Sequence, residues 1–109
     1  MSLIAAAAVI ALIGAPGLAT GQSVKIAYIN SMSGGPGIYG KHGKNGFDLG
    51  VDHLGGKLGG LDTEIVTADD ELKPDVAANK ARELVERDGA EFVVGPIFSN
   101  IMAAIAKPV

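Results

Sequence analysis

Three short runs of β-branched and other apolar residues alternate along this chain with three longer segments whose apolar residues recur at helical spacing. The predicted strands are Ser23–Ile29, Glu64–Ala68 and Glu91–Val94, and the predicted helices are Gly40–Leu54, Pro74–Arg87 and Ser99–Ala106. Strands that alternate with helices over short connections form a parallel sheet through right-handed crossovers, with helices packed on its faces. The sequence therefore predicts an α/β fold, a three-layer parallel sheet of βαβαβα order.

Local signals support two of these helices and one turn region. Phe47, Val51 and Leu54 recur at i, i+4 and i+7, which is the apolar stripe of a helix. Pro74 is well placed to open the next helix, because the N–H that proline lacks would have no partner in a first turn. Between these helices, the glycine-rich run Gly55–Gly60 is interpreted as a double turn.

The first 21 residues differ in composition from the rest of the chain. No charged side chain occurs before Lys25, and Leu3–Ile13 is an uninterrupted run of eleven apolar residues. That length fits the core of a signal peptide and falls short of the roughly 20 residues needed to span a bilayer. Small residues at 17–21 offer a cleavage site. We therefore expect residues 1–21 to be a signal peptide that directs the protein to the periplasm.

Composition excludes several classes of function. The 109 residues contain no cysteine, which excludes a disulfide scaffold, a thiolate metal site and a cysteine nucleophile. A net charge of −3 argues against nucleic-acid binding, which depends on basic surface. His42 and His53 lie about three helical turns apart, too far to chelate one ion, and are expected at the surface. No catalytic triad or acid–base pair emerges, so we predict no catalytic residue, metal or cofactor.

One motif suggests an enzyme. Gly35–Gly40 satisfies G-x-G-x-x-G between a predicted strand and helix, and Asp69 ends the next strand, where a ribose-binding carboxylate would lie. However, five residues separate Ile29 from Gly35, and Asp69 follows Gly35 by 34 residues instead of the usual 20 or so. A glycine-rich turn explains the motif better, and a dinucleotide-binding enzyme is kept as an alternative. The acidic run 69–71 is interpreted as a solvated strand end.

The segment Gly95–Asn100 is the best candidate for a binding site, because it directly follows the third predicted strand. In open α/β sheets, ligands lie beyond the carboxyl ends of the strands. Ser99 is expected to cap the third helix, whose free N–H groups and positive dipole end attract an anion. An ordinary helix cap without a ligand remains the alternative from position alone.

Four segments, in order, resemble the periplasmic solute-binding proteins of ABC importers, in the branched-chain amino-acid-binding (Leu/Ile/Val) family. They are Lys25–Ser33 with Gly34 and Tyr39-Gly40, Leu54–Gly60, Asp69-Asp70 with Lys73-Pro74 and Ala78–Arg82, and Phe92–Ser99 with Ala103–Pro108. The resemblance covers essentially all of residues 23–109. It implies the first βαβαβα part of lobe 1 of a type I periplasmic-binding-protein fold. Residues 22–109 are thus expected to be a partial N-terminal lobe, an N-terminal fragment without the second lobe.

The resemblance also implies a function and a site. Such a protein captures a small carboxylate, either a branched-chain amino acid or an aromatic acid, between two lobes and delivers it to an inner-membrane ABC permease, without a cofactor. The family's carboxylate-binding serine carries over to Ser99, and its aromatic residue over the ligand carries over to Tyr39. Phe98 and Asn100 flank Ser99 and make this loop look more like that of relatives that bind benzoates. A periplasmic ligand-sensing domain of a receptor uses the same lobes and is the alternative function.

Overall fold

The computed structural model describes residues 22–107, so the expected signal peptide at 1–21 lies outside the described residues. The chain forms strand β1 (Ser23–Asn30), helix α1 (Gly37–His53), strand β2 (Lys57–Leu58) and strand β3 (Leu61–Asp69). Helix α2 (Pro74–Arg82) continues into the π-helical turn η1 (Glu83–Arg87), followed by strand β4 (Phe92–Val94) and helix α3 (Ser99–Ile105). None of the helices within 22–107 is long and apolar enough to cross a membrane.

The sheet has the strand order β2-β3-β1-β4, with β1 in parallel pairing on both sides. Its pairing with β3 runs from Ser23 opposite Asp62 to Asn30 opposite Asp69. The α/β fold with a mainly parallel sheet is therefore confirmed. β2 is an exception, because it pairs antiparallel to β3 across the two-residue turn Gly59-Gly60. The double-turn interpretation missed this strand, since two residues between glycines are too few to show a period.

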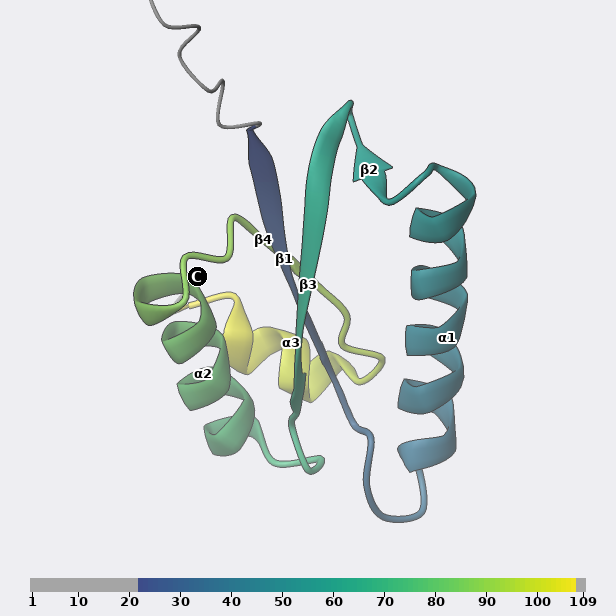
Figure 1. The fold of residues 1–109 in the computed structure, drawn as a ribbon. Coiled ribbons are helices and arrows are strands. Elements are labelled where there is room, and N and C mark those ends of the chain that lie inside the picture. The colour runs from purple at the N-terminus through teal and green to yellow at the C-terminus, as the bar shows by residue number, and fades with distance from the viewer. Residues whose placement is uncertain (1–21, 108–109) are drawn as a thin grey trace, which may run out of the picture.

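Helices cover both faces of the sheet, as Figure 1 shows, with α1 on one side and α2 and α3 on the other. Successive side chains of a strand point to opposite faces. Ala27 and Ile29 of β1 accordingly join the buried cluster on the α2 and α3 side. Tyr28 points the other way and meets Phe47 of α1, with the two ring centroids 5.9 Å apart. The three predicted layers are present.

The predicted helix Pro74–Arg87 changes its winding before its end. Pro74 occupies the first turn of α2, as predicted, but the regular α-helix stops at Arg82. In η1 the Asp88 N–H bonds to the Glu83 carbonyl, 3.2 Å away and five residues back. This wider turn keeps Leu84 buried on the sheet. The hydrophobic period predicts a helix over this segment but does not distinguish an α-turn from a π-turn.

The parallel strands β1, β3 and β4 point the same way, so their carboxyl ends meet at one edge of the sheet. Residues 31–36, 70–73 and 95–98 follow these ends and are called here the carboxyl edge. Figure 1 shows the loops after β1 and β3 together at the lower end of the molecule. This edge is where an open α/β sheet binds its ligands.

Candidate functional site

The four residues predicted to bind a ligand all lie beside the carboxyl edge. Tyr39, in the first turn of α1, is 62% exposed. Ser99 and Asn100 begin α3 and are also exposed, whereas Phe98 is partly buried and packs against the core cluster. Because α1 and α3 cover opposite faces, Tyr39 and Ser99 border the edge from opposite sides of the sheet. Tyr39, Ser99 and Asn100 are thus accessible to a ligand, while Phe98 contributes to packing.

The prediction that Ser99 caps α3 is wrong. The capping position belongs to Phe98, which has an extended backbone (φ −94°, ψ 130°), and Ser99 is the first residue of the helix. The Phe98 carbonyl accepts hydrogen bonds from the N–H groups of Ile101 and Met102 at 3.1 and 3.0 Å. Packing of the Phe98 ring against the core accounts for this shift by one residue. Consequently the Ser99 hydroxyl is not used as a helix cap.

Gly95 brings the loop before α3 against the end of β1. Its φ of +101° is one that L side chains rarely adopt, and a Cβ at this position would overlap the Ile29 carbonyl oxygen. Close approach of the two backbones therefore requires glycine here. The loop that carries Ser99 consequently starts from a fixed point on the central strand.

A buried hydrogen-bond chain, which sequence reasoning missed, joins three segments at this edge. Asn30, at the end of β1, is 3% exposed. Its Oδ1 accepts from the N–H of Ser31 at 3.0 Å and from the N–H of Ile97 at 3.3 Å. Its Nδ2 donates to the Tyr28 hydroxyl at 3.1 Å, and that hydroxyl donates to the Gly40 carbonyl at 3.0 Å. The only sequence signal for this hydrogen-bond chain is a polar residue, Asn30, directly after the predicted strand Ser23–Ile29.

The acidic run at the end of β3 is structural, and the expectation of a solvated strand end is wrong for Asp70, which is fully buried. Asp70 Oδ1 accepts from the Ser31 hydroxyl at 2.5 Å and from the Leu72 N–H at 2.8 Å. Asp69 Oδ1 accepts from the N–H groups of Met32 and Glu71, both at 2.9 Å. These two carboxylates fix the carboxyl edge in place because the surrounding backbone amides need acceptors.

Hydrogen bonding also sets the acidity of Asp69. Partial burial by itself raises the pKa of this carboxyl, but hydrogen bonds from Met32, Glu71 and Ser33 outweigh burial and hold the pKa below its ordinary value of 3.8. Within residues 22–107, no group of three or more His, Cys, Asp or Glu side chains is placed to hold a metal ion. Both histidines of α1 are exposed, as predicted.

The glycine-rich motif Gly35–Gly40 has a packing role. Gly40 is buried where α1 begins, and a Cβ there would overlap the Ser31 carbonyl oxygen. The motif therefore lets the helix approach the preceding loop, and this packing accounts for Gly40 without a ligand. This favours the interpretation as a glycine-rich turn over a dinucleotide site.

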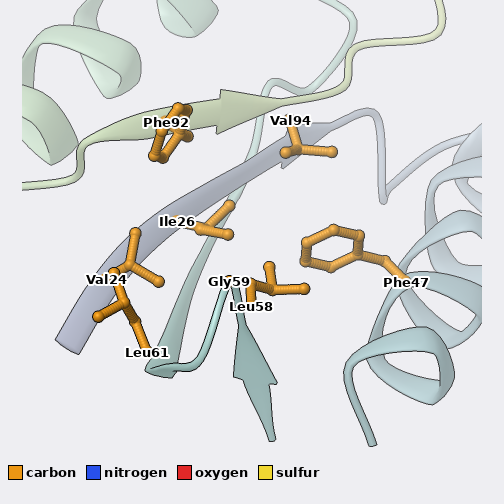
Figure 2. Close-up of a pocket in the computed structure, with 8 residues that line it drawn as sticks. All are labelled: Val24, Ile26, Phe47, Leu58, Gly59, Leu61, Phe92 and Val94. Atoms are coloured by element: carbon orange, nitrogen blue, oxygen red, sulfur yellow. The ribbon is translucent and has the colours of Figure 1, made fainter. Parts of the chain in front are cut away.

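A hollow, called here the apolar groove, lies between α1 and the sheet (Figure 2). Its volume is about 460 Å³. The lining residues are Val24, Ile26, Phe47, Leu58, Gly59, Leu61, Phe92 and Val94. Val24 and Ile26 belong to the first half of β1, and none of the lining side chains is polar. A carboxylate would find no side-chain donor there, so the groove does not fit an acidic ligand.

Comparison with known proteins matches nearly all of the described residues to one family. A family model described as "periplasmic binding protein" matches residues 23–109. Among solved structures, a periplasmic binding protein from Burkholderia mallei is 36% identical, with a TM-score of 0.73, and the match covers 80% of this chain and 24% of that one. No curated protein matches the chain.

Two further solved structures contain ligands. A branched-chain amino acid transporter substrate-binding protein from Streptococcus pneumoniae, in complex with isoleucine, is 30% identical with a TM-score of 0.70, covering 77% of this chain and 25% of that one. An ABC transporter solute-binding protein from R. palustris, in complex with benzoate, is 29% identical with a TM-score of 0.74, covering 78% and 24%. The chain thus spans about a quarter of the length of these proteins.

Proposed function

Because the chain belongs to the periplasmic binding protein family and has the fold of part of lobe 1 of a type I member, we propose that it belongs to the solute-binding component of an ABC importer. The ligand is a small carboxylate, bound at the carboxyl edge between this lobe and a second one. Residues 1–21 direct the protein to the periplasm. The closed, loaded form is presented to an inner-membrane permease, as hinged lobes allow.

The observation that carries this proposal is the exposed Ser99 hydroxyl at the carboxyl edge, which is not used to cap its own helix. The loop before it is fixed to β1 by Gly95 and by the bond from the Ile97 N–H to Asn30. A preorganised hydroxyl can donate a hydrogen bond to a carboxylate without the cost of ordering a mobile loop. Tyr39 borders the same edge from the opposite face and supplies an aromatic surface.

The apolar part of the ligand meets a hydrophobic rim. Four large apolar side chains near the carboxyl edge are strongly exposed: Ile38 at 55%, Tyr39 at 62%, Leu72 at 42% and Ile97 at 50%. Exposed apolar groups gathered at a binding edge favour a ligand with an apolar body. Both a branched aliphatic chain and a benzene ring meet this requirement. The ligand is therefore a branched-chain amino acid or an aromatic acid.

A thermal-shift screen followed by calorimetry tests the function. The full-length protein is screened against leucine, isoleucine, valine, benzoate and 4-hydroxybenzoate, and each acid that raises Tm is titrated. Ser99→Ala should weaken its binding by about 1.5–3 kcal/mol, the range for a hydrogen bond to a charged group. Ser23→Ala is the matched control, because Ser23 is exposed at the opposite edge of the sheet and should leave affinity unchanged.

Two results would contradict the proposal at different points. If none of these acids shifts Tm or gives a calorimetric signal, the ligand class is wrong. If an acid binds but Ser99→Ala leaves its affinity at the wild-type value, the protein is a carboxylate binder whose contact lies elsewhere.

A further inference from the structure

We infer that Asn30 and Tyr28 form a positioning relay that sets the spacing between the two sides of the ligand site. This inference rests on the proposed function, because it concerns the residues that hold Ser99 and Tyr39 and not those two residues themselves. Neither Asn30 nor Tyr28 touches the ligand, since both are 3% exposed. They act through the backbone of the segments on either side.

On one side, the relay reaches the loop that leads to Ser99. The Ile97 N–H donates to Asn30 Oδ1 at 3.3 Å, two residues before the candidate serine. Asn30 lies at the end of the central strand, which pairs with strands on both sides and is the most constrained element of the sheet. A displacement of Asn30 would therefore move the Ile97 backbone and, with it, the start of α3.

On the other side, the relay reaches the turn that carries Tyr39. The Tyr28 hydroxyl accepts from Asn30 Nδ2 at 3.1 Å and donates to the Gly40 carbonyl at 3.0 Å. Gly40 directly follows Tyr39, so this bond fixes the position of the first turn of α1 relative to β1. The Tyr28 ring also packs against Phe47 further along α1. The two candidate ligand residues are thus linked through four hydrogen-bonding groups in series: Ile97 N–H, the Asn30 carboxamide, the Tyr28 hydroxyl and the Gly40 carbonyl.

The chemistry of the relay requires an amide at position 30. Oδ1 accepts two backbone N–H groups, while Nδ2 must donate to a hydroxyl that is itself committed as a donor. A carboxylate could accept but not donate, and it would bring a negative charge close to an anion site. Buried polar chains of this kind favour a single geometry, because each broken bond leaves an unpaired group.

A double-mutant cycle with Ser99 tests the inference in the full-length protein. The probe is whichever of isoleucine, benzoate or 4-hydroxybenzoate binds the wild type, titrated by calorimetry. Asn30→Leu removes both the hydrogen-bond acceptor and the donor of this side chain with little change in its volume. It should weaken binding by about 10-fold or more. In a Ser99→Ala background the same change should weaken binding by less than about 3-fold, because one of the two contacts that it misplaces is already gone.

Thr63→Val is the matched control for a purely structural role. Thr63 also joins two backbone segments through its side chain, at 3.0 Å from the Leu58 N–H and 3.1 Å from the Leu61 carbonyl, but at the opposite end of the sheet. It should lower Tm without changing affinity. If Asn30→Leu does not fold, Tyr28→Phe replaces it in the cycle, with an expected loss of about 3-fold that again shrinks in the Ser99→Ala background.

The outcomes separate this inference from the proposed function. Equal losses in the two backgrounds, or no loss at all, would overturn the relay while a weakened Ser99→Ala variant still supports carboxylate capture. Absence of binding by the wild type would instead overturn the proposed function on which the relay depends.

Discussion

Asp69 and Asp70 are neighbours in the chain, yet their carboxylates hold different segments of the carboxyl edge. Asp69 accepts from the backbone N–H groups of Met32 and Glu71, while Asp70 accepts from the Ser31 hydroxyl and the Leu72 N–H. Each therefore ties the loop after β1 to the loop after β3. The two carboxylates therefore hold these two loops together at the carboxyl edge.

Acid should weaken the hydrogen bonds that the Asp69 carboxylate accepts. Because the pKa of Asp69 in the folded protein lies below its ordinary value of 3.8, its contribution to stability is complete well above that pH. It is lost as the pH falls below 3.8 towards the folded-state pKa. Denaturation midpoints measured between about pH 6 and pH 3 should fall less for Asp69→Asn than for the wild type. Parallel curves for the two proteins would contradict this role.

Gly95 lies too close to the end of β1 to accept a side chain. Gly95→Ala places a methyl group on the Ile29 carbonyl oxygen at a φ of +101°. The strain should lower the free energy of unfolding by about 1–3 kcal/mol and weaken ligand binding as well, because the Ser99 loop must move. Gly46→Ala is the control, since a Cβ there meets open space on a helix and should be neutral or stabilising. Unchanged affinity in Gly95→Ala would show that the loop tolerates the shift.

Helix α3 is short, and the packing of its buried face against the core positions Ser99. Ile101 and Ile105 of α3 are 0% and 3% exposed, next to Leu84 and the alanines of α2. Ile101→Ala should destabilise the full-length protein by about 2–5 kcal/mol, the range for truncating a buried isoleucine. Met102→Ala, one residue along the same helix and 43% exposed, should change stability by no more than about 0.5 kcal/mol. Urea denaturation compares the two, and equal effects would contradict the assigned face.

The sequence predicts strands and helices that carry a clear apolar pattern. Strands β1, β3 and β4 and the three helices are recovered, because short apolar runs indicate strands and apolar residues at helical spacing indicate helices. Strand β2 is two residues long and carries no such signal. The position of the α3 cap depends on the burial of Phe98, which is a tertiary effect invisible in the local sequence.

In the candidate site, too, the sequence predicts some residues and misses others. Tyr39, Ser99 and Asn100 are found at the expected edge, because parallel strands place their carboxyl ends together whatever their side chains. Asn30, Tyr28 and Asp70 were missed as site residues, since their partners lie from 12 to 67 residues away in the chain. Such contacts depend on how the strands pair, and pairing cannot be deduced from a single local pattern.

For the molecule as a whole, the apolar groove and the exposed edge of β4 are the features without a partner within residues 22–107. Phe92, which lines the groove, is 59% exposed. We therefore expect residues 22–109, expressed alone, to be unstable or to associate, because open strand edges and apolar surface promote both. Phe92→Glu should reduce association in analytical ultracentrifugation. A monomeric, cooperative thermal transition of the unmodified fragment would contradict this expectation.

The proposed binding site for a small carboxylate is the carboxyl edge of this lobe. A crystal structure of the full-length protein with the acid selected by the thermal-shift screen tests it most directly. We expect a carboxylate oxygen within hydrogen-bond distance of the Ser99 hydroxyl, about 2.5–3.0 Å, with the apolar body of the ligand against Tyr39. A ligand seated in the apolar groove between Phe47 and Phe92, or one whose carboxylate has no contact with residues 95–100, would contradict it.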